Sequence, residues 1–259
     1  MHPVLPSTLE EAQAVIARQQ QELAQLQGAH EAWMRAVAHD LRAPLRHVLS
    51  FAPLLRESVE ELAAAAPQAA DAVADAREFT TTMEQSARKM SAMLDGMAQV
   101  SHAARAPLAL GLIDWGVVAR HAVQRWQATH PQVQWTLPEA PVPVMADAAA
   151  LQALTEAVLH NAVKFSARQA QPVVRLSAQP LDDGWWRLQV QDQGVGFDRQ
   201  RAQHLGELFQ RMHRDAEFPG VGCGLALVQT VAQRHGARVA IEAQPQAGCT
   251  VCIDWPGAL

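Results

Sequence analysis

The sequence contains no tyrosine, and its aromatic residues make up only 5% of 259 positions. Proteins that bind single-stranded nucleic acid usually stack bases on aromatic side chains, and this small number of aromatic residues argues against such a platform. The formal net charge of -5 also lacks the positive balance that attracts nucleic acid or an acidic membrane surface. We therefore expect no nucleic-acid partner.

Long apolar runs and a cysteine framework are absent too. No stretch approaches the roughly 20 apolar residues that cross a bilayer, and residues 1–6 have neither region of a signal peptide. Three cysteines are too few for a disulfide scaffold. Cys249 and Cys252 have a C-x-x-C spacing but fall in an expected strand, where residues three apart point to opposite faces. We expect a cytoplasmic protein without membrane insertion.

The first part of the chain has helical periodicity. A heptad seam runs from Leu9 to Val37, weakened by Gln19 and His30, and a cleaner heptad begins at Leu41. The step of four between Val37 and Leu41 is a stutter that locally unwinds a supercoil. His39 precedes Leu41 by two residues, so the pattern points it outward. Pro44 should bend or loosen the helix just after it.

A second helical pattern covers about residues 69–104. Met83, Met90 and Met97 form one stripe of this helix, and methionines at this spacing are more often core than ligands. Two long helices joined by a short turn make an antiparallel hairpin. Its apolar stripe is too wide for one hairpin to bury, so we expect dimerisation into a four-helix bundle.

Beyond residue 107 the pattern mixes short strands with helices. β-like runs occur at 133–137, 173–176, 186–190, 239–241 and 250–253, and helical patterns occur at 115–129, 147–164 and 222–235. No regular βαβ repeat is present, which favours an α+β sandwich with helices on one face of a single sheet.

The expected helix at 147–164 carries Asn161 and Lys164, three residues apart and therefore on one face. An amide oxygen suits Mg²⁺, and a lysine neutralises phosphate charge. Taken alone, this pattern is more typical of an ordinary amphipathic helix with a polar rim.

Asp192, Gly194 and Gly196 directly follow an expected strand. An aspartate there can accept a hydrogen bond from an exocyclic amine such as that of adenine, and the glycines let the backbone pass close to a ligand. Hairpin turns have similar spacing, so this stretch alone is only moderately specific.

Gly220, Gly222 and Gly224 alternate just before an expected helix. Bare backbone N–H groups at the positive end of a helix form a phosphate cradle. The stretch fits neither a Walker A sequence nor the dinucleotide fingerprint. Between the two glycine stretches, residues 205–215 are polar around one apolar anchor, Phe209. They are typical of a mobile lid, with Arg211 near the phosphates.

Five motifs between about residues 30 and 255 resemble those of the sensor histidine kinases of two-component signalling. They occur in the same order and with approximately the same spacing. Residues 39–45 are similar to the phosphoacceptor box, 161–165 to the N box, 192–196 to the first glycine box, 209–213 to the F box and 220–225 to the second glycine box. The F box and residues 234–236 look closest to the kinase modules of bacteriophytochromes.

The resemblance implies a multi-domain α and α+β protein. Residues 1–30 would form a coiled-coil, signal-connecting helix. Residues 31–106 would form the dimerisation and histidine phosphotransfer domain, a helical hairpin that builds a dimeric four-helix bundle. Residues 107–259 would form an α/β sandwich, the ATP-binding catalytic domain of the histidine kinase/gyrase/Hsp90 type.

The resemblance also implies the chemistry. His39 would attack the γ-phosphate of ATP and pass the phosphoryl group to an aspartate of a response regulator, while Asp40 accepts the proton of the far imidazole nitrogen. Asn161 would hold Mg²⁺, and Asp192 would read adenine. Further nucleotide contacts would come from Lys164, Gly194, Gly196, Phe209, Arg211, Gly220, Gly222, Gly224 and Leu225. An imidazole that is largely neutral near pH 7, beside a carboxylate, suits this nucleophilic role independently.

The implied partners are a second copy of the chain, a receiver domain, and an upstream sensor domain or partner protein on the N-terminal helix. Four positions depart from the family pattern: Ala43, Ala157, Val221, where a threonine is common, and Ala237, where a glycine is common. Ala157 stands where a second asparagine often helps around the metal, so slow turnover is expected, and Ala43 stands where Thr or Asn supports phosphatase activity, so that activity should be weak. Ala157 also supports an alternative interpretation, a pseudokinase: a dimeric nucleotide-binding module that regulates a partner without phosphotransfer.

Overall fold

The computed structural model describes residues 9–198, 205–213 and 217–257. The chain divides into two compact units, Met1–Leu94 and Asp95–Leu259. The division falls inside α2 (Ala70–Ala103), so the last turns of this helix belong to the second unit. The domain borders that the sequence suggests at residues 30 and 106 stay predictions.

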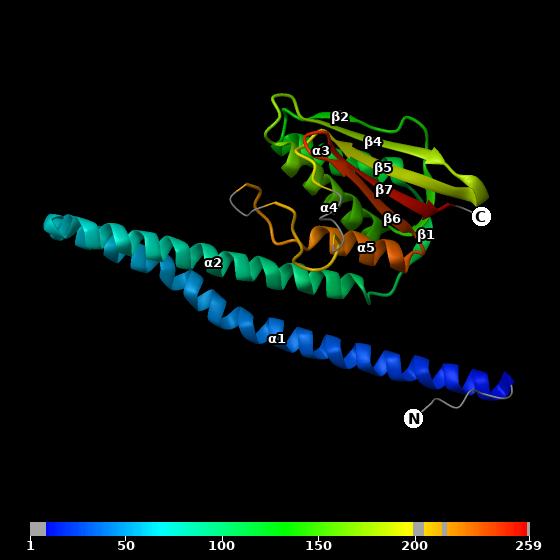
Figure 1. The fold of residues 1–259 in the computed structure, drawn as a ribbon, viewed down its shortest axis with the longest axis horizontal. Coiled ribbons are helices and arrows are strands. Elements are labelled where there is room, and N and C mark those ends of the chain that lie inside the picture. The colour runs from blue at the N-terminus through cyan, green and yellow to red at the C-terminus, as the bar shows by residue number, and fades with distance from the viewer. Residues whose placement is uncertain (1–8, 199–204, 214–216, 258–259) are drawn as a thin grey trace. The chain divides into compact units, whose positions relative to one another are not determined.

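The first unit is a helical hairpin. α1 (Leu9–Ala65) leads through one 3-10 turn, η1 (Pro67–Ala69), into α2 (Figure 1). α1 continues through Pro44 and Pro53, and Figure 1 shows it bent along its length. Proline inside a helix removes a hydrogen bond and crowds the preceding turn, so a bend without termination is the expected compromise.

The two helices pack along one half of the predicted heptad. The buried residues on α1 are Ala38, Leu45, Ala52 and Val59, and those at heptad spacing on α2 are Val73, Thr80, Ala87 and Leu94. The other half of the heptad, Leu41, Leu55 and Leu62, is exposed in the single chain. Met83 and Met90, expected in the core, are exposed as well. The hairpin therefore leaves an apolar stripe uncovered.

Ion pairs set the register of the hairpin. Glu84 on α2 is buried between Arg56 of α1 and Arg88, whose Nη2 lies 2.5 Å from a Glu84 oxygen. Hydrogen bonding from Arg88 outweighs desolvation and holds the pKa of Glu84 below its usual value. Removing one partner of such a buried group leaves an unpaired charge, so this cluster favours one alignment of the helices.

The second unit is built on a five-stranded sheet in the order β2-β4-β5-β7-β6. The strands are β2 (Gln134–Thr136), β4 (Val173–Pro180), β5 (Trp185–Asp192), β6 (Arg238–Gln244) and β7 (Gly248–Pro256), with η2 (Asp182–Gly184) between β4 and β5. β2 and β4 pair in parallel, and the other pairs are antiparallel. The helices α3 (Trp115–Thr129), α4 (Ala148–Ser166) and α5 (Gly224–Arg234) cover one face of this sheet (Figure 1).

The predicted α+β sandwich is confirmed, but the prediction of a single sheet was incomplete. β1 (Leu110–Asp114) and β3 (Pro143–Asp147) form a separate antiparallel pair. Their last residues cap the next helices: Asp114 accepts the N–H of Gly116 in α3, and Asp147 accepts the N–H of Ala150 in α4. The small sheet thus sets where α3 and α4 begin.

The faces of the large sheet differ in character. Leu188, Val190 and Ile253 point into the core shared with the helices, while Arg187 of β5 pairs with Asp254 of β7, at positions that alternate with them. Cys249 contacts the core, whereas the Cys252 thiol accepts a hydrogen bond from Gln189, so the predicted opposite orientation is confirmed. No helix of the described residues is long and apolar enough to cross a membrane.

Candidate functional site

The predicted phosphoacceptor lies in the first unit and is open to solvent. The side chains of His39 and Asp40 on α1 are 86% and 80% exposed. His39 Nδ1 lies 3.2 Å from Asp40 Oδ1. If the ring proton sits on Nδ1, it points at the carboxylate, and the Nε2 lone pair is left free for attack.

In the second unit, α4 faces the glycine-rich loop that precedes α5. A Cβ added to Gly224 would lie 3.5 Å from Nδ2 of Asn161, and one added to Gly220 would lie 3.3 Å from Nζ of Lys164. Gly220 and Gly222 have φ angles of 145° and 78°, which glycine adopts without steric cost. The structure therefore brings the predicted N box and second glycine box together, although they lie about sixty residues apart in the sequence.

The surroundings of Lys164 disfavour its positive charge, so an anion beside it would be stabilising. Its ammonium lies 4.3 Å from the centre of the Phe165 ring. Burial and then the charge of Arg211 lower the pKa of Lys164 to about 8. A phosphate placed beside it would offset both effects, and such perturbed groups cluster at functional sites.

Asp192 closes the other end of the site, at the end of β5. It is 6% exposed, and its Oδ1 accepts the backbone N–H of Gly194 at 2.8 Å. Burial raises the pKa of Asp192 to about 6, against hydrogen bonds that lower it. Side chains at Gly194 and Gly196 would collide with the backbone oxygens of Phe165 and Gln244, so both positions require glycine. A buried carboxylate held this way is poised to accept a hydrogen bond from a ligand.

The prediction that Phe209 anchors the lid is wrong. Phe209 is 37% exposed and has a φ of 67°, held by its N–H donating to Gly222 O at 3.0 Å. The buried aromatic is Phe218, which is 4% exposed and packs edge-on against Phe165 with ring centres 5.1 Å apart. Composition predicts an aromatic anchor, but it does not tell which of two phenylalanines turns inward.

The remaining predicted residues lie nearby. A Cβ at Gly222 would be 3.1 Å from Cγ of Arg211, and Arg211 Nη2 donates to Phe218 O at 2.6 Å. Leu225 is partly buried in the first turn of α5. Residues 214–215, at the end of the predicted lid, lie outside the described residues. That the lid is mobile and that Arg211 reaches phosphates stay predictions.

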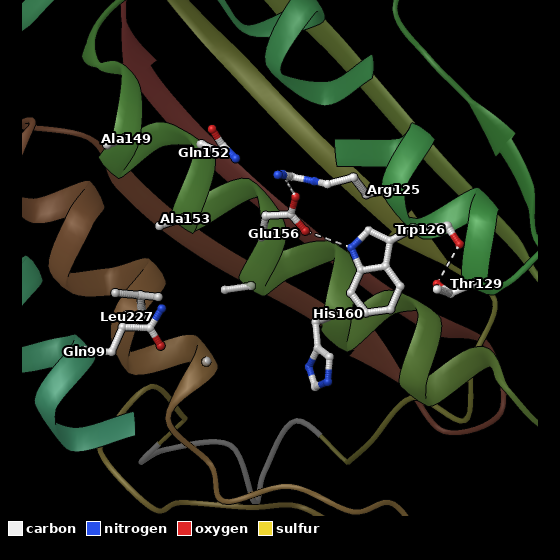
Figure 2. Close-up of a pocket in the computed structure, with 12 residues that line it drawn as sticks. Gln99, Arg125, Trp126, Thr129, Ala149, Gln152, Ala153, Glu156, His160 and Leu227 are labelled. Atoms are coloured by element: carbon white, nitrogen blue, oxygen red, sulfur yellow. Dashed lines mark hydrogen bonds and ion pairs between the residues drawn. The ribbon is translucent and has the colours of Figure 1, made fainter. Parts of the chain in front are cut away.

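A pocket of about 820 Å³ lies beside this site, and the sequence did not predict it. Figure 2 shows the residues that line it. Its walls come from α3 and α4, where Nε1 of Trp126 donates to Glu156 at 2.9 Å and Arg125 pairs with the same carboxylate. His160 and Gly224 also line it, so the pocket opens next to Asn161 and the glycine loop. No motif marks these residues, since their meeting depends on how α3 packs against α4.

The donor set fits a nucleotide that carries its own metal. Among the described residues, no three His, Cys, Asp or Glu side chains gather into an independent metal site. Mg²⁺ usually takes one or two protein oxygens and completes its shell with phosphate and water. One amide oxygen, from Asn161, beside a glycine cradle matches that pattern.

Comparison with known proteins agrees with this geometry. Residues 146–259 match the family described as "Histidine kinase-, DNA gyrase B-, and HSP90-like ATPase". Over 252 residues the sequence is 28% identical to cyanobacterial phytochrome A of Nostoc sp. (strain PCC 7120), covering 93% of this chain and 31% of that protein. It is 27% identical over 231 residues to the histidine protein kinase DivJ of Caulobacter vibrioides, covering 85% of this chain and 36% of DivJ. The chain spans about a third of the length of these relatives.

A solved structure supports the same relationship. The mycobacterial sensor histidine kinase MprB aligns with a TM-score of 0.51 and 27% identity, covering 57% of this chain and 98% of that one. The ATPase match lies in the second unit, and the relatives extend it across the helical hairpin that carries His39. Residues 146–259 therefore form a domain of this ATPase family, and the chain as a whole is similar to sensor histidine kinases.

Proposed function

We propose that the protein is an ATP-dependent autokinase that phosphorylates His39 and passes the phosphoryl group to an aspartate on the receiver domain of a response regulator. The observation that carries this proposal is the meeting of Asn161 with Gly224 and of Lys164 with Gly220 in the catalytic unit. The exposed His39–Asp40 pair supplies a matching acceptor.

ATP is the proposed phosphoryl donor. Its adenine amine would donate to the buried carboxylate of Asp192, in a turn that Gly194 and Gly196 allow to pack closely against the backbone of Phe165 and Gln244. Its phosphates would meet positive charge from Lys164 and Arg211 and the N–H groups at the start of α5. The proposed contacts at this end are Lys164, Phe209, Arg211, Gly220, Gly222, Gly224 and Leu225.

Mg²⁺ would neutralise charge on the phosphates when bound. The protein oxygen offered to it is that of Asn161. Ala157, one turn earlier on α4, brings no second amide. We therefore retain the expectation of slow turnover.

The transfer itself uses few protein groups. Nε2 of His39 would form a bond to the γ-phosphorus while the bond from that phosphorus to the bridging oxygen breaks and ADP leaves. Asp40 accepts the Nδ1 proton and offsets the positive charge that develops on the ring. In the second step a receiver carboxylate oxygen would take the phosphoryl group and the N–P bond would break, while Asp40 returns its proton to Nδ1 and so restores neutral His39.

The exposed stripe on the hairpin supports a homodimer. It combines residues from both helices, Leu41, Leu55, Leu62, Phe79, Met83 and Met90. A second hairpin placed on this stripe would bury it in a four-helix bundle. An upstream sensor domain or partner would act through the N-terminal part of α1. The three free cysteines suit a reducing cytoplasm.

The comparisons give no support to the pseudokinase alternative. Incubation with γ-labelled Mg-ATP separates the two functions. The autokinase predicts an acid-labile, base-stable label that is lost in His39→Gln and kept in His47→Gln, a matched exposed histidine on the same helix. Nucleotide binding without such a label on the wild type would leave the pseudokinase as the function.

A further inference from the structure

Gly96 lies in the last turns of α2, where helix formation alone does not explain a glycine. Gly96 belongs to the second unit, and glycine is among the poorest helix formers. A Cβ at this position would lie 2.6 Å from Sγ and 2.8 Å from Cβ of Cys223, and 3.7 Å from Val221. Non-bonded carbons do not approach this closely, so a side chain at position 96 would have to displace Cys223 or α2.

Cys223 links this contact to the nucleotide site. It stands between Gly222 and Gly224, is 7% exposed, and its carbonyl accepts the N–H of Leu227 in α5 at 3.0 Å. The N–H of Phe209 donates to the Gly222 carbonyl at 3.0 Å, and the same N–H counteracts the effect of burial on the pKa of the Cys223 thiol. Movement of Cys223 would therefore move the glycine loop and the start of the F box together.

A second contact holds the same segment at the far end of α5. Nη1 of Arg234 donates to the carbonyls of Ala103 and Ala106, at 2.9 and 2.6 Å. Val100 and Ala103 also pack on the core of the unit. Because the segment is fastened at this end, a side chain added at Gly96 cannot be relieved by simply lifting the helix away.

We propose that Gly96 is a positioning residue for nucleotide binding, because it lets α2 seat against Cys223 and so holds the second glycine box in the shape that receives phosphates. Gly96 acts through the backbone on either side of Cys223 and does not touch the nucleotide. This inference rests on the proposed function. Burial raises the pKa of the Cys223 thiol, which fits a protonated packing surface better than a reactive group.

The test begins with Gly96→Ala, measured by titration calorimetry with ADP and with ATP. Hydrogen-bond donors displaced by roughly an ångström bind poorly, so we expect about tenfold weaker binding of both nucleotides. Helix content should stay the same or rise, because alanine favours helix. Gly28→Ala is the matched control, since it also replaces a helical glycine but its Cβ would meet nothing within 4 Å.

Rescue distinguishes positioning from general damage. Cys223→Gly removes both atoms that the new Cβ would strike, and glycine is tolerated at a helix N-cap. In the double variant, adding Gly96→Ala should change ADP affinity by less than about twofold relative to Cys223→Gly alone. An equal loss in both backgrounds would overturn the proposal, as would wild-type affinity in Gly96→Ala.

Thiol labelling tests the packing of α2 against Cys223 without nucleotide. In Gly96→Ala, Cys223 should react with a disulfide reagent about tenfold faster than in the wild type, with the labelled peptide identified by mass spectrometry. An unchanged rate would refute the seat. If the wild type bound no ADP, the proposed function would fail, while this labelling result would still decide whether Gly96 seats Cys223.

Discussion

Replacing Asp192 with asparagine should stabilise the catalytic unit at neutral pH and strongly weaken nucleotide binding. Asp192 is 6% exposed, and burial raises its pKa from 3.8 to about 6. Keeping this carboxylate ionised in the folded state therefore costs roughly 3 kcal/mol at pH 7 and above. Such a cost in a core persists in proteins where function requires the charge.

The asparagine would recover most of this cost. Its Oδ1 can still accept the N–H of Gly194. Its Nδ2 cannot accept from the Cys249 N–H, which helps to lower the pKa of Asp192, and this loss costs about 1 kcal/mol. The net gain of about 2 kcal/mol corresponds to a rise in Tm of about 4 to 8 °C. Because the folded-state pKa is raised, the wild-type penalty grows between pH 4 and pH 6, so the advantage of Asp192→Asn should shrink toward pH 4.

Thermal unfolding across this pH range, paired with ADP calorimetry, measures both effects. Nucleotide affinity should fall about 100-fold or more, because a buried acceptor for the adenine amine is lost. Asp254→Asn is the control: Arg187 lowers the pKa of Asp254, so this variant should lose stability at neutral pH and keep its affinity. The reasoning fails if Asp192→Asn lowers Tm at pH 7 and still binds ADP like the wild type.

Three further predictions concern charge and assembly. In calorimetric titrations, the affinity of the wild type for ADP should fall above pH 8, because the pKa of Lys164 is about 8. Lys164→Arg should keep its affinity at pH 9. A wild-type affinity that does not change with pH would contradict this. Glu84→Gln should lower the melting temperature of the hairpin by circular dichroism at pH 7. Because the arginines lower the folded-state pKa of Glu84, this difference should begin to shrink below pH 4.5 and vanish only once the pH falls below that lowered pKa. Equal melting temperatures at pH 7 would refute it. Leu55→Glu should convert dimer to monomer in sedimentation equilibrium, because it places a charge on the exposed stripe, and an unchanged mass would show that the dimer forms elsewhere.

Local patterns predict the helices of the second unit well. α3 begins and ends where its 3.6-residue period does, at Trp115 and Thr129, because Asp114 caps its first turn. β1 and β3 escape such patterns. Each has five residues, and Gly111 and Pro143 weaken their local strand preference. They exist because they pair with each other across an intervening helix, which periodicity does not report.

The site shows the same division between local and tertiary information. Motif spacing singles out Asn161, Lys164 and Asp192, since their chemistry suits a nucleotide. It does not show that Gly224 faces Asn161 or that Phe218 is the buried aromatic, because those contacts depend on the packing of α4, α5 and the loop between β5 and α5. Likewise, a heptad repeat does not reveal which half of the seam faces α2 and which half is left for a partner.

The central claim, attack by Nε2 of His39 with Asp40 on the Nδ1 side, is tested most directly by ³¹P NMR of the full chain after incubation with Mg-ATP. A phosphoramidate on Nε2 has a resonance distinct from one on Nδ1. We predict a single Nε2 phosphohistidine signal that is absent from His39→Gln, although that variant still binds ADP. A signal from an Nδ1 phosphohistidine, or from a phosphoester or acyl phosphate that persists in His39→Gln, would contradict the account.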